Sequence, residues 1–163
     1  MKASPRIPPV LWKVLSRFNH LMVSRYGAKS KAASRVLILT TIGRKSGRPR
    51  PTPLQYEQVE NNFYVASARG KGADWYRNLL VYPSVEVRVG DRQFSTRAEL
   101  ITDPAQVADF LELRMRRHPR FMRVMLRLEG LPNRSTRGDL EKLAERLAIV
   151  RLPVDPKQTA GIN

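Results

Sequence analysis

The stretch RVLILTTIGRKSGRPR, residues 35–50, joins an apolar segment to a short basic loop. Residues 35–42 are mostly aliphatic or β-branched, which is typical of a buried β-strand, and Gly43 ends them. The loop that follows holds two glycines among four Arg and Lys residues. Glycines permit a tight turn whose N–H groups converge on an anion, while Arg and Lys donate charge-assisted hydrogen bonds to phosphate oxygens. We interpret this loop as phosphate-binding, with a solvated basic turn or a nucleic-acid contact as the alternatives.

The residues after this loop predict two β-hairpins around a short helix. Each pair of apolar segments is separated by turn residues, at 60–62 and at Gly90-Asp91. A break at 69–72 lies between the pairs, and Pro83 ends the helical pattern that follows it. The expected strands span residues 52–59, 62–68, 85–89 and 93–100, and the expected helix spans 73–81.

Helices are expected at both ends of this β-rich region. Apolar residues from Val10 to Tyr26 recur at helical spacing and predict a basic amphipathic helix that ends at Gly27. We interpret it as packed on the domain, with a membrane-surface or partner-binding helix as the alternative. Asp103 is a suitable N-cap for a later helix. The later expected elements are a helix to about 117, a basic segment to 128, a helix over 139–146 and a strand over 147–152.

Antiparallel hairpins around short helices favour an α+β fold with a small barrel over a doubly wound sheet. We expect a single domain over residues 1–163, because its length suits one domain. The expected parts are an N-terminal helical segment (1–34), the barrel core (35–102), a helical segment (103–146), the last strand (147–152) and a flexible tail (156–163).

The composition excludes several classes of site. The chain has no cysteine, which excludes disulfides, iron–sulfur clusters and thiolate nucleophiles, and its two histidines lie in no ligand motif, so we expect no metal site. A formal net charge of +16 raises the expectation of an anionic partner: nucleic acid, an acidic membrane or a phosphorylated ligand. The N-terminus resembles neither a signal peptide nor a transmembrane helix. We therefore expect a cytoplasmic protein, with association with an anionic membrane as an alternative.

A second segment, residues 66–79, contains residue types suited to a flat ligand. The strand before it ends in small residues that let a ligand approach the backbone, and Ser67 offers a hydroxyl group. Trp75 and Asn78 are three residues apart on the expected helix and so share a face. The alternative is that Trp75 and Leu79 are core residues and that Asn78 caps a turn.

The motifs of both segments occur in the order of a known family. They are Leu39–Arg50, Pro53–Tyr56, Ala66-Ser67 with Gly70, Trp75-Tyr76-x-Asn78-Leu79, and Pro83-x-Val85-x-Val87. In this order they resemble the deazaflavin-dependent nitroreductase family, which is related to pyridoxamine-phosphate oxidase-like flavoproteins. The resemblance implies a split β-barrel of mainly antiparallel strands, with an N-terminal amphipathic helix and a helical insertion before the last strand.

The resemblance also implies a cofactor, coenzyme F420, and a set of residues that bind it. The residues implied for its phosphate and acidic tail are Arg44, Lys45, Ser46 and Arg50. The residues implied around the deazaflavin ring are Pro53, Leu54, Gln55, the backbone of Ala66, Ser67 and Ala68, and the side chains of Trp75 and Asn78. The implied reaction is hydride transfer to a quinone, an enone or a nitro compound. Ser67 and Tyr76 are candidate proton donors, and solvent is a third.

Other ligands and partners stay open at this stage. The same fold suits an FMN flavoprotein, or a protein that binds haem or a fatty acid without turnover. Gly47-Arg48-Pro49 is similar to the core of an AT-hook, but Ser46 replaces its first arginine and no aromatic residues alternate with the basic runs, so nucleic acid is the least favoured partner. Homodimers are common among split-barrel relatives, which leaves a homodimer open here, and no feature of the sequence supports one. The basic run Arg114–Arg127 has no assigned role.

Overall fold

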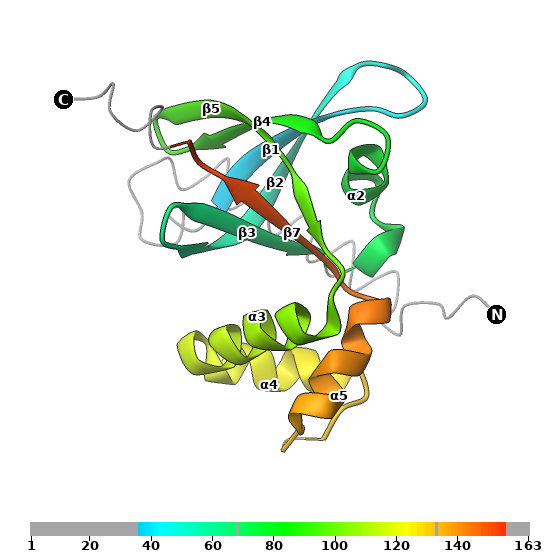
Figure 1. The fold of residues 1–163 in the computed structure, drawn as a ribbon, viewed down its shortest axis with the longest axis vertical. Coiled ribbons are helices and arrows are strands. Elements are labelled where there is room, and N and C mark those ends of the chain that lie inside the picture. Colours follow the sequence, from blue (N-terminus) through cyan, green and yellow to red (C-terminus); the bar gives the residue numbers. More distant parts are fainter. Residues whose placement is uncertain (1–35, 68, 133, 156–163) are drawn as a thin grey trace.

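One curled antiparallel sheet of seven strands dominates the computed structural model, which describes residues 36–67, 69–132 and 134–155 (Figure 1). The strands are β1 (Val36–Ile42), β2 (Pro49–Val59), β3 (Asn62–Ser67), β4 (Ser84–Val89), β5 (Arg92–Arg97), β6 (Glu99–Ile101) and β7 (Ala148–Pro153). The helices are α2 (Asp74–Leu79), α3 (Pro104–Arg117), α4 (Pro119–Leu128) and α5 (Arg137–Lys142), with 3-10 turns η2 (Gly70–Gly72) and η3 (Leu143–Glu145).

The sheet curls because the chain joins its two edges. The strand order is β5-β4-β1-β2-β3-β7-β6, so β5 and β6 lie at opposite edges although only Ala98 separates them in the sequence. The amide of Ala98 donates to the carbonyl of Pro83 (2.8 Å), and the Thr96 hydroxyl on β5 donates to the carbonyl of Pro153 at the end of β7 (2.7 Å). The predicted α+β split-barrel fold is therefore confirmed.

Two of the predicted strands differ from the observed ones. The single strand expected over 93–100 is wrong: residues 92–97 pair with β4 and residues 99–101 pair with β7. An alternating pattern shows which face a residue occupies but not that the strand changes partner. The strand expected from residue 52 begins at Pro49. Its prolines are tolerated because β2 pairs only with β1 there, and its pairing with β3 starts at Tyr56.

The helical segment follows the prediction closely. Asp103 caps α3 and accepts the amide hydrogen of Gln106 (3.0 Å), as expected for an N-cap. The last helix begins at Arg137, two residues before its predicted start, because Thr136 and Asp139 form a capping box. No helix of the described residues is long and apolar enough to span a membrane. The predicted N-terminal helix and the tail over 156–163 lie outside the described residues, and the domain division stays a prediction.

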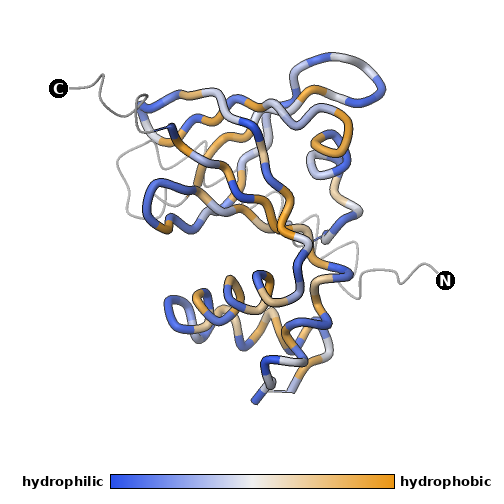
Figure 2. The backbone as a smooth tube through the Cα atoms, in the orientation of Figure 1, coloured by the Kyte–Doolittle hydropathy of each residue, from blue (hydrophilic) through white to orange (hydrophobic). Residues whose placement is uncertain are grey.

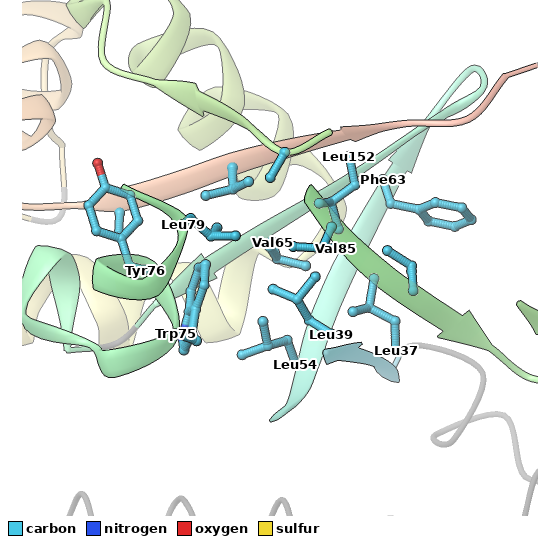
Figure 3. Close-up of a cluster of buried hydrophobic side chains, with 14 of the residues drawn as sticks. Leu37, Leu39, Leu54, Phe63, Val65, Trp75, Tyr76, Leu79, Val85 and Leu152 are labelled. Carbon is cyan, nitrogen blue, oxygen red and sulfur yellow. The ribbon is translucent and has the colours of Figure 1, made fainter. Parts of the chain in front are cut away.

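Apolar side chains from several strands and from α2 fill the interior of the barrel (Figure 3). Along β1 alternate residues point inward, so that Leu37 and Leu39 are completely buried. Trp75 and Leu79 of α2 close one end of this cluster. Helix α2 is therefore attached to the barrel by its apolar face.

A second apolar cluster joins the outer face of the sheet to the helices α3, α4 and α5. Ile149 of β7 and Tyr64 of β3 face outward there, and the Tyr64 ring stacks on Phe110 of α3 with the ring centroids 5.8 Å apart. Val107 of α3 is completely buried in the same cluster. The barrel and the helical layer thus have separate cores on the two faces of the same strands.

A buried carboxylate on β2 joins the barrel to the junction of α3 and α4. One oxygen of Glu57, Oε1, lies 2.8 Å from His118 Nε2 and 3.5 Å from Arg114 Nε, while Oε2 lies 3.2 Å from Arg117 Nη1. Burial lowers the pKa of Arg114, and the negative charge of Glu57 opposes this shift. Glu57 and Arg114 are both largely buried, so each needs the other's charge.

We predict that Glu57→Gln lowers the free energy of unfolding by about 2–4 kcal/mol, because Arg114 then stays buried without a counter-charge. Urea denaturation measures this. The control is Glu86→Gln on the exposed side of β4, which should change stability by less than about 0.5 kcal/mol. Equal effects of the two substitutions would show that the carboxylate does not hold the helices to the sheet.

Candidate functional site

The loop between β1 and β2 is a tight turn built on Gly43. The amides of Ser46 and Gly47 both donate to the Gly43 carbonyl (3.1 and 2.7 Å), and the Gly43 amide donates to Arg48 O (2.9 Å). Gly47 has φ +63°, which favours glycine. The Arg48 amide donates to Ser46 Oγ (3.4 Å). Because these amides are already used, a bound anion would meet side chains here more than converging N–H groups.

Asn78 of α2 attaches this loop to the helix. Its side chain is buried, and its Oδ1 accepts from both the backbone amide and Nη1 of Arg44, each at 3.1 Å. Its Nδ2 donates to Oγ1 of Thr41, which is completely buried at the end of β1 (3.0 Å). The Asn78 side chain therefore ties together a strand, a loop and a helix, and we call this arrangement the Asn78 clamp.

The side chain of Arg44 completes the clamp. Its Nη2 lies 3.0 Å from the carboxylate of Asp74, and its Nη1 also donates to the Asp74 carbonyl (3.4 Å). Sequence reasoning missed both Thr41 and Asp74. The signal for Thr41 was a polar residue at an inward position of an alternating strand, whereas nothing in the sequence pairs Arg44 with Asp74. Arg44 and Asn78 stay predictions as cofactor ligands, and the structure gives both a positioning role.

Three exposed cations remain, namely Lys45 and Arg48 in the loop and Arg50 at the start of β2, and we call them the cationic tip. Arg50 Nη2 donates to Ser46 Oγ (3.4 Å), which keeps Ser46 beside them. The tube of this loop is mostly hydrophilic in colour (Figure 2). No acidic residue precedes Glu57 in the sequence, so the loop carries no opposing charge of its own.

The residues predicted around the ring lie on both faces of the sheet. Leu54 and Trp75 are buried in the barrel core, which supports the alternative interpretation of Trp75 as a core residue (Figure 3). Their neighbours Pro53 and Gln55 face outward, and Gln55 is exposed. Ala66 packs against the cluster under the helical layer. These side chains thus point to both faces of the sheet, and as ring contacts they stay predictions; Ala68 lies outside the described residues.

Both candidate proton donors are largely buried. Ser67 Oγ accepts the amide hydrogen of Arg69 (3.1 Å), which leaves the serine's own hydroxyl proton for donation. Burial raises the pKa of Tyr76, so its phenol keeps its proton at neutral pH. Within the described ranges, no group of three His, Asp or Glu side chains is arranged to hold a metal ion.

The turn before α2 lies against the end of the helical layer. The Lys71 amide donates to the carbonyl of Arg146 (3.1 Å), and Gly70 has φ +55°. A Cβ atom at Gly70 would lie 2.3 Å from that same carbonyl oxygen. Only glycine allows this approach, which holds the start of α2 against the residues that lead into β7.

A sequence model of the F420H(2)-dependent quinone reductase family matches residues 14–129. This chain belongs to that family. The match includes the Asn78 clamp, the cationic tip and most of the helical layer, and it confirms the resemblance to deazaflavin-dependent reductases. The F420H(2)-dependent quinone reductase of Mycobacterium tuberculosis is 32% identical over 78 residues, which are 46% of this chain and 52% of that relative. The chain thus spans about half the length of the curated relatives it matches.

Solved structures agree with the fold of this F420H(2)-dependent quinone reductase family member. A solved F420-H2 dependent reductase superposes with a TM-score of 0.51 at 18% identity, over 72% of this chain and 93% of that one. The haem storage protein HutZ of Vibrio cholerae gives the same TM-score and identity, over 75% of this chain and 82% of that one. Because proteins named for different ligands superpose equally well, the fold alone does not select the ligand.

We predict that Asn78→Ala lowers the free energy of unfolding by about 2–3 kcal/mol, because buried polar groups lose their partners. Hydrogen–deuterium exchange of the amides in residues 43–48 should also become faster, because the loop loses its attachment to α2. The control is Gln93→Ala, which removes an exposed amide on β5. If loop exchange and stability were both unchanged in Asn78→Ala, the clamp would not hold the loop.

Gly70→Ala and Gly47→Ala form a matched pair, because both glycines have positive φ but only Gly70 lies against the backbone. Nothing lies within 4 Å of a Cβ atom at Gly47. We expect both substitutions to cost roughly 1 kcal/mol from the left-handed backbone. Gly70→Ala should cost about 2 kcal/mol more from the steric conflict. Equal denaturation midpoints for the two variants would contradict the close approach.

Proposed function

We propose that this protein reduces a quinone with reduced coenzyme F420. The family match over residues 14–129 carries this proposal, because it includes the loop and helix that form the candidate site. The name of the M. tuberculosis relative supports the same cofactor and substrate. Enones and nitro compounds stay alternative electrophiles of the same chemical type.

The chemistry of the cationic tip fits the anionic part of F420. That cofactor carries a phosphate and a glutamate tail, and Lys45, Arg48 and Arg50 offer exposed cations within six residues of the chain, in the loop and at the start of β2. Hydrogen bonds between charged groups contribute about 1.5–3 kcal/mol each. The Asn78 clamp fixes the loop before the ligand arrives, so binding costs less ordering of the chain.

Ser67 and Tyr76 are our candidates for the proton that the reaction needs. When bound, reduced F420 supplies a hydride, and a quinone that takes this hydride and one proton becomes the hydroquinone. The phenol of Tyr76 is protonated at neutral pH, although burial raises its pKa and makes it the weaker acid, and Ser67 has a hydroxyl proton to give. Both stay candidate proton donors beside solvent.

The alternative ligands differ from F420 in ways that binding can distinguish. FMN has a phosphate but no acidic tail, whereas haem and fatty acids lack the deazaflavin ring. The family match favours F420 over all three, although HutZ shares the fold. A homodimer and contact with an anionic membrane also stay predictions.

The test compares three ligands with two proteins. Binding of F420, of the same deazaflavin without phosphate and tail, and of FMN is measured by tryptophan fluorescence quenching with wild type and with Lys45→Ala/Arg50→Ala. We expect the double variant to bind F420 at least about tenfold more weakly, because two charge-assisted contacts are lost. Its affinity for the deazaflavin without the tail should not change.

The control is Arg88→Ala/Arg97→Ala, which removes two exposed cations from β4 and β5 and should bind F420 as wild type does. Steady-state oxidation of reduced F420 by a soluble quinone then tests the reaction. The proposal fails if wild type binds FMN as tightly as F420, or if reduced F420 is not oxidised when the quinone is present.

A further inference from the structure

The helix α4 has an apolar face that the protein only partly covers. Six of its residues are apolar, and at 3.6 residues per turn they span an arc of about 200° around the helix. Met122 and Leu126, on one side of this arc, are buried against the helical layer. Phe121 and Val124, toward the other side, are 43% and 60% exposed. This half of the apolar arc is therefore only partly covered in the described structure.

Positive charge adjoins the partly covered half of this arc. Arg120, Arg123 and Arg127 follow one another on the remaining face of α4, and all three are exposed. The helix contains no acidic residue, and Glu129 just after it lies 3.5 Å from Arg146. The whole surface, which we call the α4 face, thus combines two exposed apolar side chains with a row of arginines.

The junction with α3 fixes the position of the α4 face. Glu57 binds His118 and Arg117 just before the helix begins, and Arg114 lies over the Phe121 ring with Cζ 5.2 Å from its centroid. The helix is therefore anchored to the barrel at its N-terminal end, within the layer of helices below the barrel (Figure 1). Phe121 is held in place while a large part of its ring stays exposed.

The chemistry of the α4 face suits a lipid surface better than a protein partner. A stable protein interface buries at least about 1,000 Å², with an apolar centre inside a polar rim. Two exposed apolar side chains do not supply such a centre. An interfacial helix needs only a few apolar side chains at the acyl boundary and cations at the phosphates, and each Arg near an anionic membrane raises binding about fivefold.

We propose that the α4 face docks on an anionic lipid bilayer, with Phe121 and Val124 entering the headgroup region and the arginines beside them meeting lipid phosphates. The arginines of the basic run Arg114–Arg127 then have two different roles. Arg114 is largely buried against Glu57 and the more exposed Arg117 also pairs with it, while Arg120, Arg123 and Arg127 are exposed on α4. The proposal does not depend on the reaction, and it fails or holds separately from F420 binding.

The first test measures sedimentation of the full chain with phosphatidylcholine vesicles, with and without phosphatidylglycerol. We expect binding only to the anionic vesicles. Phe121→Ser/Val124→Ser should weaken vesicle binding at least about tenfold, since the two apolar side chains that would enter the bilayer are lost. The matched control is Leu80→Ser/Val81→Ser, which alters an equally exposed apolar pair after α2. Circular dichroism and urea denaturation confirm that the variants are folded.

The second test places a reporter on each surface. Phe121→Trp should shift its fluorescence to shorter wavelength and be quenched by brominated lipid, whereas Leu80→Trp should show neither change. Arg120→Gln/Arg123→Gln should weaken vesicle binding more than Arg88→Gln/Arg97→Gln does. Equal losses in the two arginine pairs, equal quenching at the two tryptophans, or binding that survives Phe121→Ser/Val124→Ser would overturn the proposal.

A third measurement tests a second copy of the chain as the occupant of the α4 face. Sedimentation velocity without lipid should show the same oligomeric state for wild type and for Phe121→Ser/Val124→Ser. If the wild type forms a dimer that this variant abolishes, a second copy of the chain covers the α4 face and the lipid proposal is wrong.

Discussion

The side chain of Asn78 is the interaction on which the site depends. It is buried. Its amide nitrogen donates to Thr41 and its carbonyl oxygen accepts from Arg44, so that one residue joins β1, the loop after it and α2. An unsatisfied buried amide would be costly, which makes this geometry strongly preferred. Asp74 holds the other side of the Arg44 guanidinium. The loop that carries Lys45, Arg48 and Arg50 therefore projects from a fixed base.

The positive charge of the chain divides into parts with different tasks. Arg44 in the clamp pairs with the exposed carboxylate of Asp74, Arg114 pairs with the buried carboxylate of Glu57, and both pairs hold elements together. The cationic tip and the arginines of α4 are exposed on two separate elements. The cationic tip and the α4 face are thus two outward basic surfaces among the 30 Lys and Arg residues of the chain, and we propose an acidic cofactor tail for the first and an acidic membrane for the second.

The sequence predicted the order of strands and helices because alternation, turn residues and caps are local signals. It did not predict that the chain crosses between sheet edges at Ala98, since both halves of that segment alternate in the same way. At the site, the basic loop and the shared face of Trp75 and Asn78 were visible in the spacing. The pairing of Arg44 with Asp74 could not be predicted from the spacing, because these residues are 30 positions apart and only the packing of α2 brings them together.

A crystal structure of the protein with F420 bound tests the central claim most directly. We expect the phosphate or the glutamate carboxylates within hydrogen-bond distance of Lys45, Arg48 or Arg50, while Arg44 stays on Asn78 and Asp74. A phosphate and tail bound elsewhere on the protein, away from this loop, would contradict the account.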